Sequence, residues 1–144
     1  MFVVDTNVLV YAADEASPHH RRCLEQLDLW RRQAAAWYLT WGIIYEFLRI
    51  TTHPRVMRKP WEAQQAWRFV EALLASPGLA VLVATDRHAA VAAKVFEEIP
   101  HVSGNLVHDA CTAILMREHG VRSIYTRDTD FHRFPFLDPL DPLS

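Results

Sequence analysis

Cysteine is scarce in this chain of 144 residues, which contains only Cys23 and Cys111. Two cysteines are too few for a disulfide framework. Neither C-x-x-C nor H-E-x-x-H occurs, so the sequence gives no sign of a zinc site. We expect Cys111 to lie in an apolar helix and to pack in the core, because free cysteine behaves as a small apolar residue.

Long apolar runs are also missing. No run approaches the roughly 20 residues that a membrane-spanning helix needs. The N-terminal segment has no basic residue and reaches Asp5 after three apolar ones, which is unlike a signal peptide. We therefore expect a cytoplasmic protein without a membrane partner.

An excess of basic charge is absent as well, since 15 Lys and Arg stand against 17 Asp and Glu, a net charge of −2. This balance argues against a generally basic coat for nucleic acid, but it allows a local basic patch. Apolar residues are abundant at 51%, and five are tryptophans. A small domain cannot bury every large apolar side chain, so we expect part of this surface to contact a partner.

Short apolar runs and helical patterns alternate along the chain. Strands are predicted at 2–4, 35–39, 79–84 and 121–126, with a short edge strand at 136–140. Helices are predicted near 6–12, 18–32, 41–52, 60–75, 86–99 and 106–119. We predict a single domain over residues 1–144 with a three-layer α/β/α fold and a mainly parallel sheet. The continuous apolar run at 79–84 is typical of a strand buried on both faces of such a sheet.

Asp5 follows the first predicted strand directly and precedes a segment that can continue as a helix. A helix N-cap, at Asp5 or Thr6, is the simplest role for this position, and Thr40 can cap the helix at 41–52 in the same way. However, the carboxyl ends of strands are also where open α/β sheets bind ligands. Three more acidic positions at the edges of apolar segments favour a ligand site at Asp5.

Glu46 lies in the predicted helix at 41–52, close to its wide apolar face. A buried carboxylate is costly without a cationic partner. Two partners fit equally well, namely Arg49 at i+3 on the same helix, or a metal ion. The sequence leaves both open.

Asp109 lies one turn into the helix at 106–119, between Leu106 and Ala113 on the apolar side. The helix dipole favours an acidic group there, but this explains an exposed aspartate better than one among apolar neighbours. His108 lies about 100° around the helix from Asp109, so we interpret it as a flanking residue.

Asp128 and Asp130 follow the last long strand. An Asx turn that begins a short helix is the simpler explanation for Asp130 alone. Asp5 and Asp128 both end parallel strands, and the helix of Asp109 can point at the same edge of the sheet. These carboxylates can therefore meet.

The most basic stretch of the chain is 49–59, which contains no acidic residue. Its cationic side chains are Arg49, Arg55, Arg58 and Lys59. Such a run is usually a solvated loop, but here it is also the best candidate for holding phosphates.

Four carboxylates cannot all stay ionised within a few ångströms unless cations neutralise them. No lysine or arginine is placed among Asp5, Glu46, Asp109 and Asp128 in a way that would serve. Hard oxygen ligands suit Mg²⁺ or Mn²⁺, which also bind substrate phosphate. Such an ion lowers the pKa of a water and stabilises charge on a phosphoryl oxygen. The pattern therefore predicts phosphodiester hydrolysis without a covalent intermediate.

Four segments in this order resemble the PIN-domain proteins, and more narrowly the VapC-type toxins of bacterial toxin–antitoxin pairs. The segments are 4–12, 45–49 with 52–56, 105–110 and 126–131. No single segment is specific, but the four in order are, and they extend over essentially the whole chain.

The resemblance implies a divalent-metal-dependent endoribonuclease that forms a homodimer and is inhibited by an antitoxin protein encoded beside it. Carried over by position, the catalytic and metal-binding quartet is Asp5, Glu46, Asp109 and Asp128. The supporting residues are Asn7, Thr126 and Asp130. The stretch at 49–59 becomes a candidate for RNA binding. No quartet member is missing, so nothing suggests an inactive enzyme.

Three alternatives stay open. A phosphotransferase with Asp5 as nucleophile would resemble haloacid-dehalogenase-type enzymes, but Asn7 cannot be their general acid. A metal-free ribonuclease would need two of the eight histidines, which show no paired pattern. A non-catalytic module could bind RNA or a protein through 49–59. An Asp5→Asn variant separates the last from an enzyme, because a binder keeps its function.

Overall fold

The computed structural model describes residues 1–144, and a five-stranded sheet runs through its middle in the order β3-β2-β1-β4-β5. The strands are β1 (Phe2–Val4), β2 (Trp37–Thr40), β3 (Leu79–Leu82), β4 (Ser123–Tyr125) and β5 (Asp138–Leu140). Every pair of neighbouring strands is parallel. All five carboxyl ends therefore lie at one edge of the sheet.

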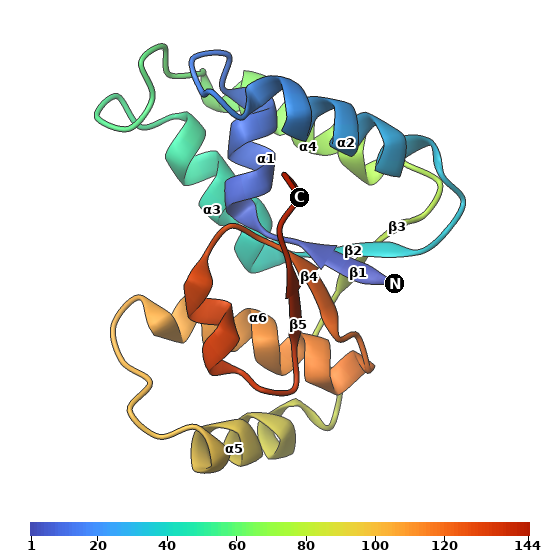
Figure 1. Cartoon of the computed structure of the whole chain (residues 1–144), viewed down its shortest axis with the longest axis vertical. Helices are drawn as coiled ribbons and strands as arrows, with labels where there is room; N and C mark the ends of the chain where they lie inside the picture. Colours follow the sequence, from blue (N-terminus) through green and yellow to red (C-terminus); the bar gives the residue numbers. More distant parts are fainter.

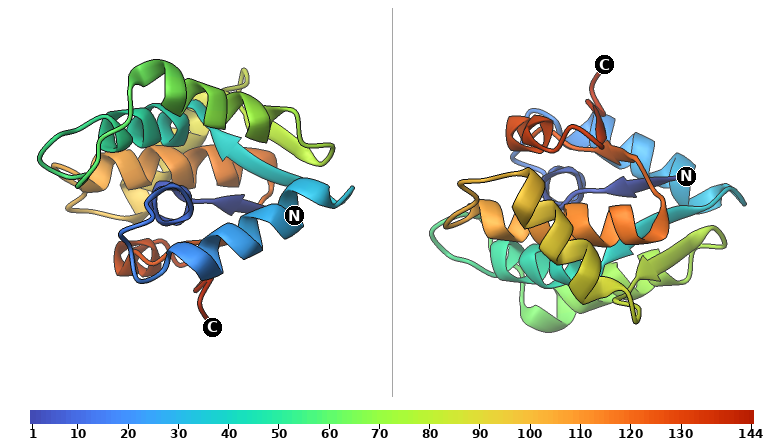
Figure 2. Two further views of the ribbon diagram at one scale, coloured as in Figure 1. Left: turned by 90° about the horizontal axis from the view of Figure 1, so that it is seen from above. Right: turned by 90° about the horizontal axis from the view of Figure 1, so that it is seen from below.

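Helices cover both faces of the sheet (Figures 1 and 2). They are α1 (Thr6–Ala13), α2 (His20–Arg32), α3 (Trp41–Thr51), α4 (Ala63–Leu74), α5 (His88–Glu98) and α6 (Leu106–His119), with the 3-10 helix η1 (Thr129–Arg133) after β4. In Figure 1, α1, α2 and α4 lie above the strands, and α5 and α6 lie below them. The predicted α/β fold with a parallel sheet is confirmed. None of the helices combines the length and apolarity that crossing a membrane requires.

β1 is the central strand of the sheet, and its apolar side chains suit this buried position. Val3 and Val4 are fully buried, and β1 pairs with β2 on one side and β4 on the other. On one face, the Trp30 ring of α2 packs 5.1 Å from that of Phe2 and 4.7 Å from that of Tyr125. These contacts pack α2 against the first residue of β1 and the last residue of β4.

Two helices begin directly at strand ends, and side-chain caps fix their first turns. Asp5 is the N-cap of α1, and its Oδ1 accepts from the Thr6 amide at 2.8 Å. Thr40 is the N-cap of α3, and its Oγ1 accepts from the Ile43 amide at 3.1 Å. Thr6 Oγ1 donates to the Ile43 carbonyl at 3.3 Å and so ties the two helix starts together. The expected caps at Asp5 and Thr40 are confirmed.

Two expectations about apolar segments are wrong. β3 lies at the edge of the sheet, ends at Leu82 and leaves Ala80 exposed, whereas burial on both faces was expected. A continuous apolar run does not reveal that a strand has a neighbour on one side only. Cys111 is exposed, because Ala110 and Ala113 occupy the core side of α6.

The start of α4 also differs from the prediction. The helix begins at Ala63 with Glu62 as N-cap, whereas a start at Pro60 was expected. The Trp61 amide donates to the Thr51 carbonyl at 2.8 Å, so the preceding segment is held against the end of α3. This bond makes residues 60–62 part of the connection between α3 and α4.

Candidate active site

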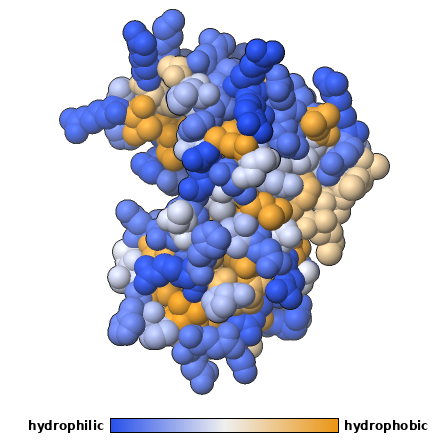
Figure 3. Space-filling model, in the orientation of Figure 1, coloured by the Kyte–Doolittle hydropathy of each residue, from blue (hydrophilic) through white to orange (hydrophobic).

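A cleft of about 810 Å³ opens beyond the carboxyl edge of the sheet, lined by residues of α1, α3, α6 and η1. Figure 3 shows the surface indented on its left side, between the upper and lower helices of Figure 1. All four predicted carboxylates line this cleft, together with two of the supporting residues: Asp5, Asn7, Glu46, Asp109, Asp128 and Asp130. The third supporting residue, Thr126, is buried beside Asp5.

Asp5 is buried, with 8% of its surface exposed. Its amide donates to the Tyr125 carbonyl at 3.0 Å, so the β1–β4 pairing fixes its main chain. Its Oδ2 accepts from Thr126 Oγ1 at 2.7 Å and from Asn7 Nδ2 at 3.2 Å. Since Oδ1 already caps α1, both carboxylate oxygens are held in direction.

Thr126 and Asn7 join the end of β1 to the turn after β4. Thr126 Oγ1 accepts from the Asp128 amide at 2.9 Å, and Asn7 Oδ1 accepts from the Arg127 amide at 3.3 Å. Asn7 Nδ2 also lies 3.3 Å from Thr126 Oγ1. These bonds satisfy the main chain of the turn and set Asp128 in position relative to Asp5.

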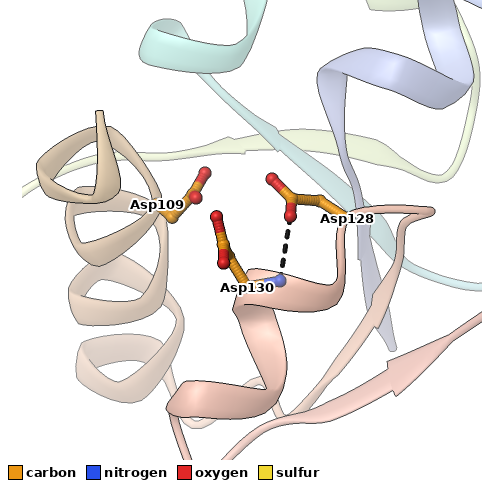
Figure 4. A group of neighbouring side chains, drawn as sticks. All are labelled: Asp109, Asp128 and Asp130. Atoms are coloured by element: carbon orange, nitrogen blue, oxygen red, sulfur yellow. Dashed lines mark hydrogen bonds between the residues drawn. The ribbon is translucent and has the colours of Figure 1, made fainter.

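Asp109, Asp128 and Asp130 form the closest acidic group, with one carboxylate oxygen of each within 4.8 Å of the others. Figure 4 shows Asp109 reaching from α6 and the other two from the start of η1, all three toward one point. Asp128 Oδ1 accepts from the Asp130 amide at 2.9 Å, which is the Asx turn that begins η1.

No lysine or arginine forms an ion pair with any of these three aspartates. Three converging carboxylates without a cationic partner are the oxygen donor set that Mg²⁺ or Mn²⁺ takes in proteins. The residues present therefore fit a hard divalent ion.

Glu46 lies at the rim of the cleft and is paired with Arg49. Arg49 Nε and Nη2 donate to its Oε2 at 3.0 Å and its Oε1 at 2.7 Å. These hydrogen bonds hold the pKa of Glu46 below its usual range. Of the two partners left open by the sequence, Arg49 is in contact, and Glu46 stands outside the close group of three aspartates.

The buried Asp5 and the half-buried Asp109 ionise less readily than ordinary aspartates. Burial raises the pKa of Asp5 to about 6, although hydrogen bonds from Thr126 and Thr6 act in the opposite direction. Burial raises the pKa of Asp109 to about 7, and the charges of Asp128 and Asp5 add to this. The site thus concentrates negative charge that a divalent cation would neutralise.

α6 contributes polar residues that the sequence reasoning missed. Asn105, His108 and Thr112 line the cleft with Asp109. Their spacing of i, i+3, i+4 and i+7 makes one polar stripe among the apolar residues at the start of α6, and this stripe was a usable signal. His108, interpreted as a flanking residue, faces the cleft, and its charge adds to that of Arg49 in lowering the pKa of Glu46.

The basic stretch at 49–59 has one member in the cleft. Arg49 lines it, whereas Arg55, Arg58 and Lys59 are exposed in the connection between α3 and α4. This connection projects outward at the upper left of Figure 1. Met57, at 4% exposure, anchors it to the molecule. The three outer cations therefore lie beyond the lining of the cleft, on the side of α3.

Comparison with known proteins gives one consistent family. Residues 2–137 match the model of the PIN domain family. Ribonuclease VapC48 of Mycobacterium tuberculosis is 30% identical over 140 residues, which cover 97% of this chain and 96% of that protein. Ribonuclease VapC37 of the same species is 34% identical over 134 residues, covering 93% and 92%.

A solved structure shares the fold. VapBC2 from Rickettsia felis, bound to a DNA fragment from their promoter, superposes with a TM-score of 0.68 at 16% identity, covering 97% of each chain. The family match, the near full-length relatives and the shared fold agree with the resemblance of the four sequence segments. This chain belongs to the PIN domain family, among its VapC-type proteins.

Proposed function

We propose that the protein is an endoribonuclease that hydrolyses RNA phosphodiester bonds with Mg²⁺ or Mn²⁺, and that it is the toxin of a toxin–antitoxin pair. The observation that carries this proposal is the convergence of Asp109, Asp128 and Asp130 in an open cleft beside the buried Asp5. RNA as the substrate is supported by the full-length relatives, which are named ribonucleases.

The three converging aspartates would hold the ion. When bound, it supplies charge stabilisation at a phosphoryl oxygen and a lowered pKa for water. Asp128 and Asp130 come from one Asx turn, and Asp109 comes from the first turn of α6. Two rigid elements therefore set the separation of the carboxylates before any ligand enters.

Asp5 would orient the attacking water. Its carboxylate is restrained by Thr6, Thr126 and Asn7, so the remaining lone pairs have fixed directions toward the cleft. A positioned acceptor of this kind lowers the entropic cost of bringing water to the scissile phosphorus. Asn7 donates to Asp5 in this arrangement, and its amide has no acidic proton for a phosphotransferase mechanism.

Arg49 would contact substrate phosphate at the rim. Its side chain is 60% exposed even while it pairs with Glu46, so donor groups remain free toward the solvent. A planar guanidinium suits bidentate phosphate recognition. Glu46 would then hold Arg49 in position rather than bind the ion directly.

The test is cleavage of 5′-labelled structured RNA by the purified protein with Mg²⁺ or Mn²⁺. We expect cutting that EDTA and Asp5→Asn both abolish. Asp86→Asn is the matched control, because Asp86 is an exposed aspartate after β3 that does not line the cleft. Cutting that survives EDTA would overturn the metal mechanism.

The product ends give a second criterion. Attack by an external water leaves a 5′-phosphate and a 3′-hydroxyl, and we expect these ends. A 2′,3′-cyclic phosphate would mean that the ribose hydroxyl attacked, and the metal-assisted hydrolysis would be wrong.

We also propose a cognate antitoxin and a second copy of the chain as protein partners. Exposed large apolar side chains such as Leu29 (64%) and Val56 (56%) leave surface for such contacts. Light scattering after size exclusion measures the mass of the protein alone and with the product of the neighbouring gene. A monomer that does not bind that product would refute both partners.

A further inference from the structure

Two aromatic side chains stand exposed side by side on α3. The rings of Trp41 and Tyr45 have centroids 6.1 Å apart and planes inclined by 36°. Trp41 is 39% exposed and Tyr45 62%, whereas the ring of Phe47 on the same helix is fully buried. Core packing therefore does not account for this pair.

The pair borders the acidic cleft. Gly42, Tyr45, Glu46 and Arg49 follow one another at i, i+3, i+4 and i+7, so they share one face of α3. Three of these four residues line the cleft, and Tyr45 is their neighbour on the outer side. A Cβ placed on Gly42 would meet only Thr40 Oγ1, at 3.7 Å, so the surface beside the backbone of Gly42 is open.

The exposed cations that follow the pair along the chain favour a polyanion as its partner. Arg49 lies one turn beyond Tyr45 on the same face and is exposed. The connection that follows α3 carries three more exposed cations, Arg55, Arg58 and Lys59. Exposed aromatic rings combined with exposed cations bind single-stranded nucleic acid, with bases on the rings and phosphates on the cations.

We infer that Trp41 and Tyr45 form a stacking site for an unpaired base of the RNA, next to the phosphate held in the cleft. The inference rests on the proposed function, because it takes RNA as the ligand. Every base has a π face, so the site selects an unpaired or extruded nucleotide more than a particular base. The substrate class is thus RNA with a single-stranded segment or loop at the point of cleavage.

The experiment uses short single-stranded RNA with 2-aminopurine at one position, bound to the Asp5→Asn protein in Mg²⁺ so that cleavage does not interfere. Stacking on a ring quenches the fluorescence of this base. We expect quenching on binding. Tyr45→Ala and Trp41→Ala should each lose it and weaken affinity about 5- to 150-fold, from the ~1–3 kcal/mol of one stacked base. Tyr45→Phe should retain both signals.

Phe96→Ala is the matched control, since Phe96 is an aromatic residue of α5, 45% exposed and outside the cleft lining. Tyr45→Ala decides the matter if Trp41→Ala does not fold, because Tyr45 is the more exposed ring. Unchanged affinity and quenching in Tyr45→Ala would overturn the inference. If that variant instead changes only the mass of the protein in solution, the pair is a contact between copies and the inference is wrong.

Failure of the inference and failure of the proposed function give different results. Cleavage by the unsubstituted protein without quenching of any 2-aminopurine position would refute the stacking site and leave the ribonuclease intact. Quenching that depends on Tyr45, without cleavage in any divalent metal, would retain the RNA site and refute the nuclease.

Discussion

Thr126 Oγ1 donates a hydrogen bond of 2.7 Å to Asp5 Oδ2. The same oxygen accepts the Asp128 amide at 2.9 Å. One hydroxyl thus connects the carboxylate at the end of β1 with the turn that carries Asp128. Asp5 and Thr126 lie 121 positions apart in the chain, so the hydrogen bond between them depends on the central β1–β4 pairing.

Replacing this hydroxyl tests whether it positions Asp5. Thr126→Val keeps the shape of the side chain but removes its hydroxyl. The buried Asp5 carboxylate then loses a hydrogen-bond donor, and the Asp128 amide loses its acceptor. We expect a loss of about 1–3 kcal/mol in the free energy of unfolding, and a fall in kcat of about 10–100-fold, as found for groups that orient metal ligands. Urea unfolding and cleavage kinetics measure the two effects.

Thr126→Ser serves as the control, because serine keeps the hydroxyl and should retain most of the activity. If Thr126→Val cleaves RNA at the rate of the unsubstituted protein, Thr126 does not position the catalytic carboxylate.

The raised pKa values of Asp5 and Asp109 predict how metal-free stability depends on pH. Both values, about 6 and about 7, lie above the ordinary 3.8 of the unfolded chain. The folded state therefore binds more protons, and this contribution to stability is full below pH 3.8 and is lost as pH rises through 6 and 7. In EDTA these two pKa values correspond to a gain in stability of about 4 kcal/mol between pH 8 and pH 5, and solvent screening of the half-buried Asp109 reduces this figure.

The Asp5→Asn, Asp109→Asn double variant isolates these two groups from the histidines. Its urea unfolding free energy should lack that gain, and Mg²⁺ at pH 8 should stabilise the unsubstituted protein but not the variant. Equal pH profiles for the two proteins would show that folding does not raise the pKa values of Asp5 and Asp109.

The exposed cations after α3 predict a salt-dependent contribution to RNA affinity. Each phosphate contact adds to the slope of log affinity against log salt. Arg55→Ser with Arg58→Ser should weaken binding and lower that slope by about 1–2. Fluorescence anisotropy over a salt series measures it.

Arg21→Ser with Arg22→Ser removes the same charge from exposed positions of α2 and should leave the slope nearly unchanged. If both double variants behave alike, RNA responds to the overall charge of the molecule and not to the 49–59 stretch.

Glu118 lies away from the cleft, and we expect its replacement to change the stability of the fold without changing cleavage. It is buried on α6 and accepts from the Thr85 amide and from His88 Nδ1, which lies at 2.6 Å. Burial raises the pKa of Glu118, but these hydrogen bonds outweigh it and bring the pKa to about 2. Since this value lies below the unfolded 4.5, the stabilisation is present above pH 4.5 and is lost as pH falls through about 2.

Glu118→Gln should lower the free energy of unfolding by about 3 kcal/mol at pH 7, with a smaller difference near pH 3. Cleavage at 20 °C should stay normal, because Glu118 does not line the cleft. An unfolding midpoint equal to that of the unsubstituted protein would contradict the role of this hydrogen-bonded group.

The sequence predicted those parts of the site that depend on local order along the chain. Asp5 directly follows β1, and Asp128 lies in the turn after β4, so their place at one edge of a parallel sheet was predictable from the strands alone. The exposure of Cys111 could not be predicted in this way, because it depends on which side of α6 faces the sheet. The edge position of β3 likewise depends on the order of the strands in the sheet, and no local sequence pattern predicts that order.

Residue spacing alone did not predict which acidic side chains of the cleft lie close together, because this depends on side-chain geometry. Asp130 joins Asp109 and Asp128 because the Asx turn at Asp128 folds it back toward α6. Glu46 is drawn to Arg49, one of two partners that the sequence left open. Both outcomes depend on hydrogen bonds of the folded chain.

The most direct test of the metal-dependent site is RNA cleavage measured against Mn²⁺ concentration, for the unsubstituted protein and for Asp128→Asn. Metal-held catalysis predicts no cutting in EDTA and a rate that saturates with Mn²⁺. In Asp128→Asn the half-saturating concentration should rise at least about tenfold, since one carboxylate ligand is lost. Equal rates with and without the ion, or the same half-saturating concentration in both proteins, would contradict a metal held by Asp109, Asp128 and Asp130.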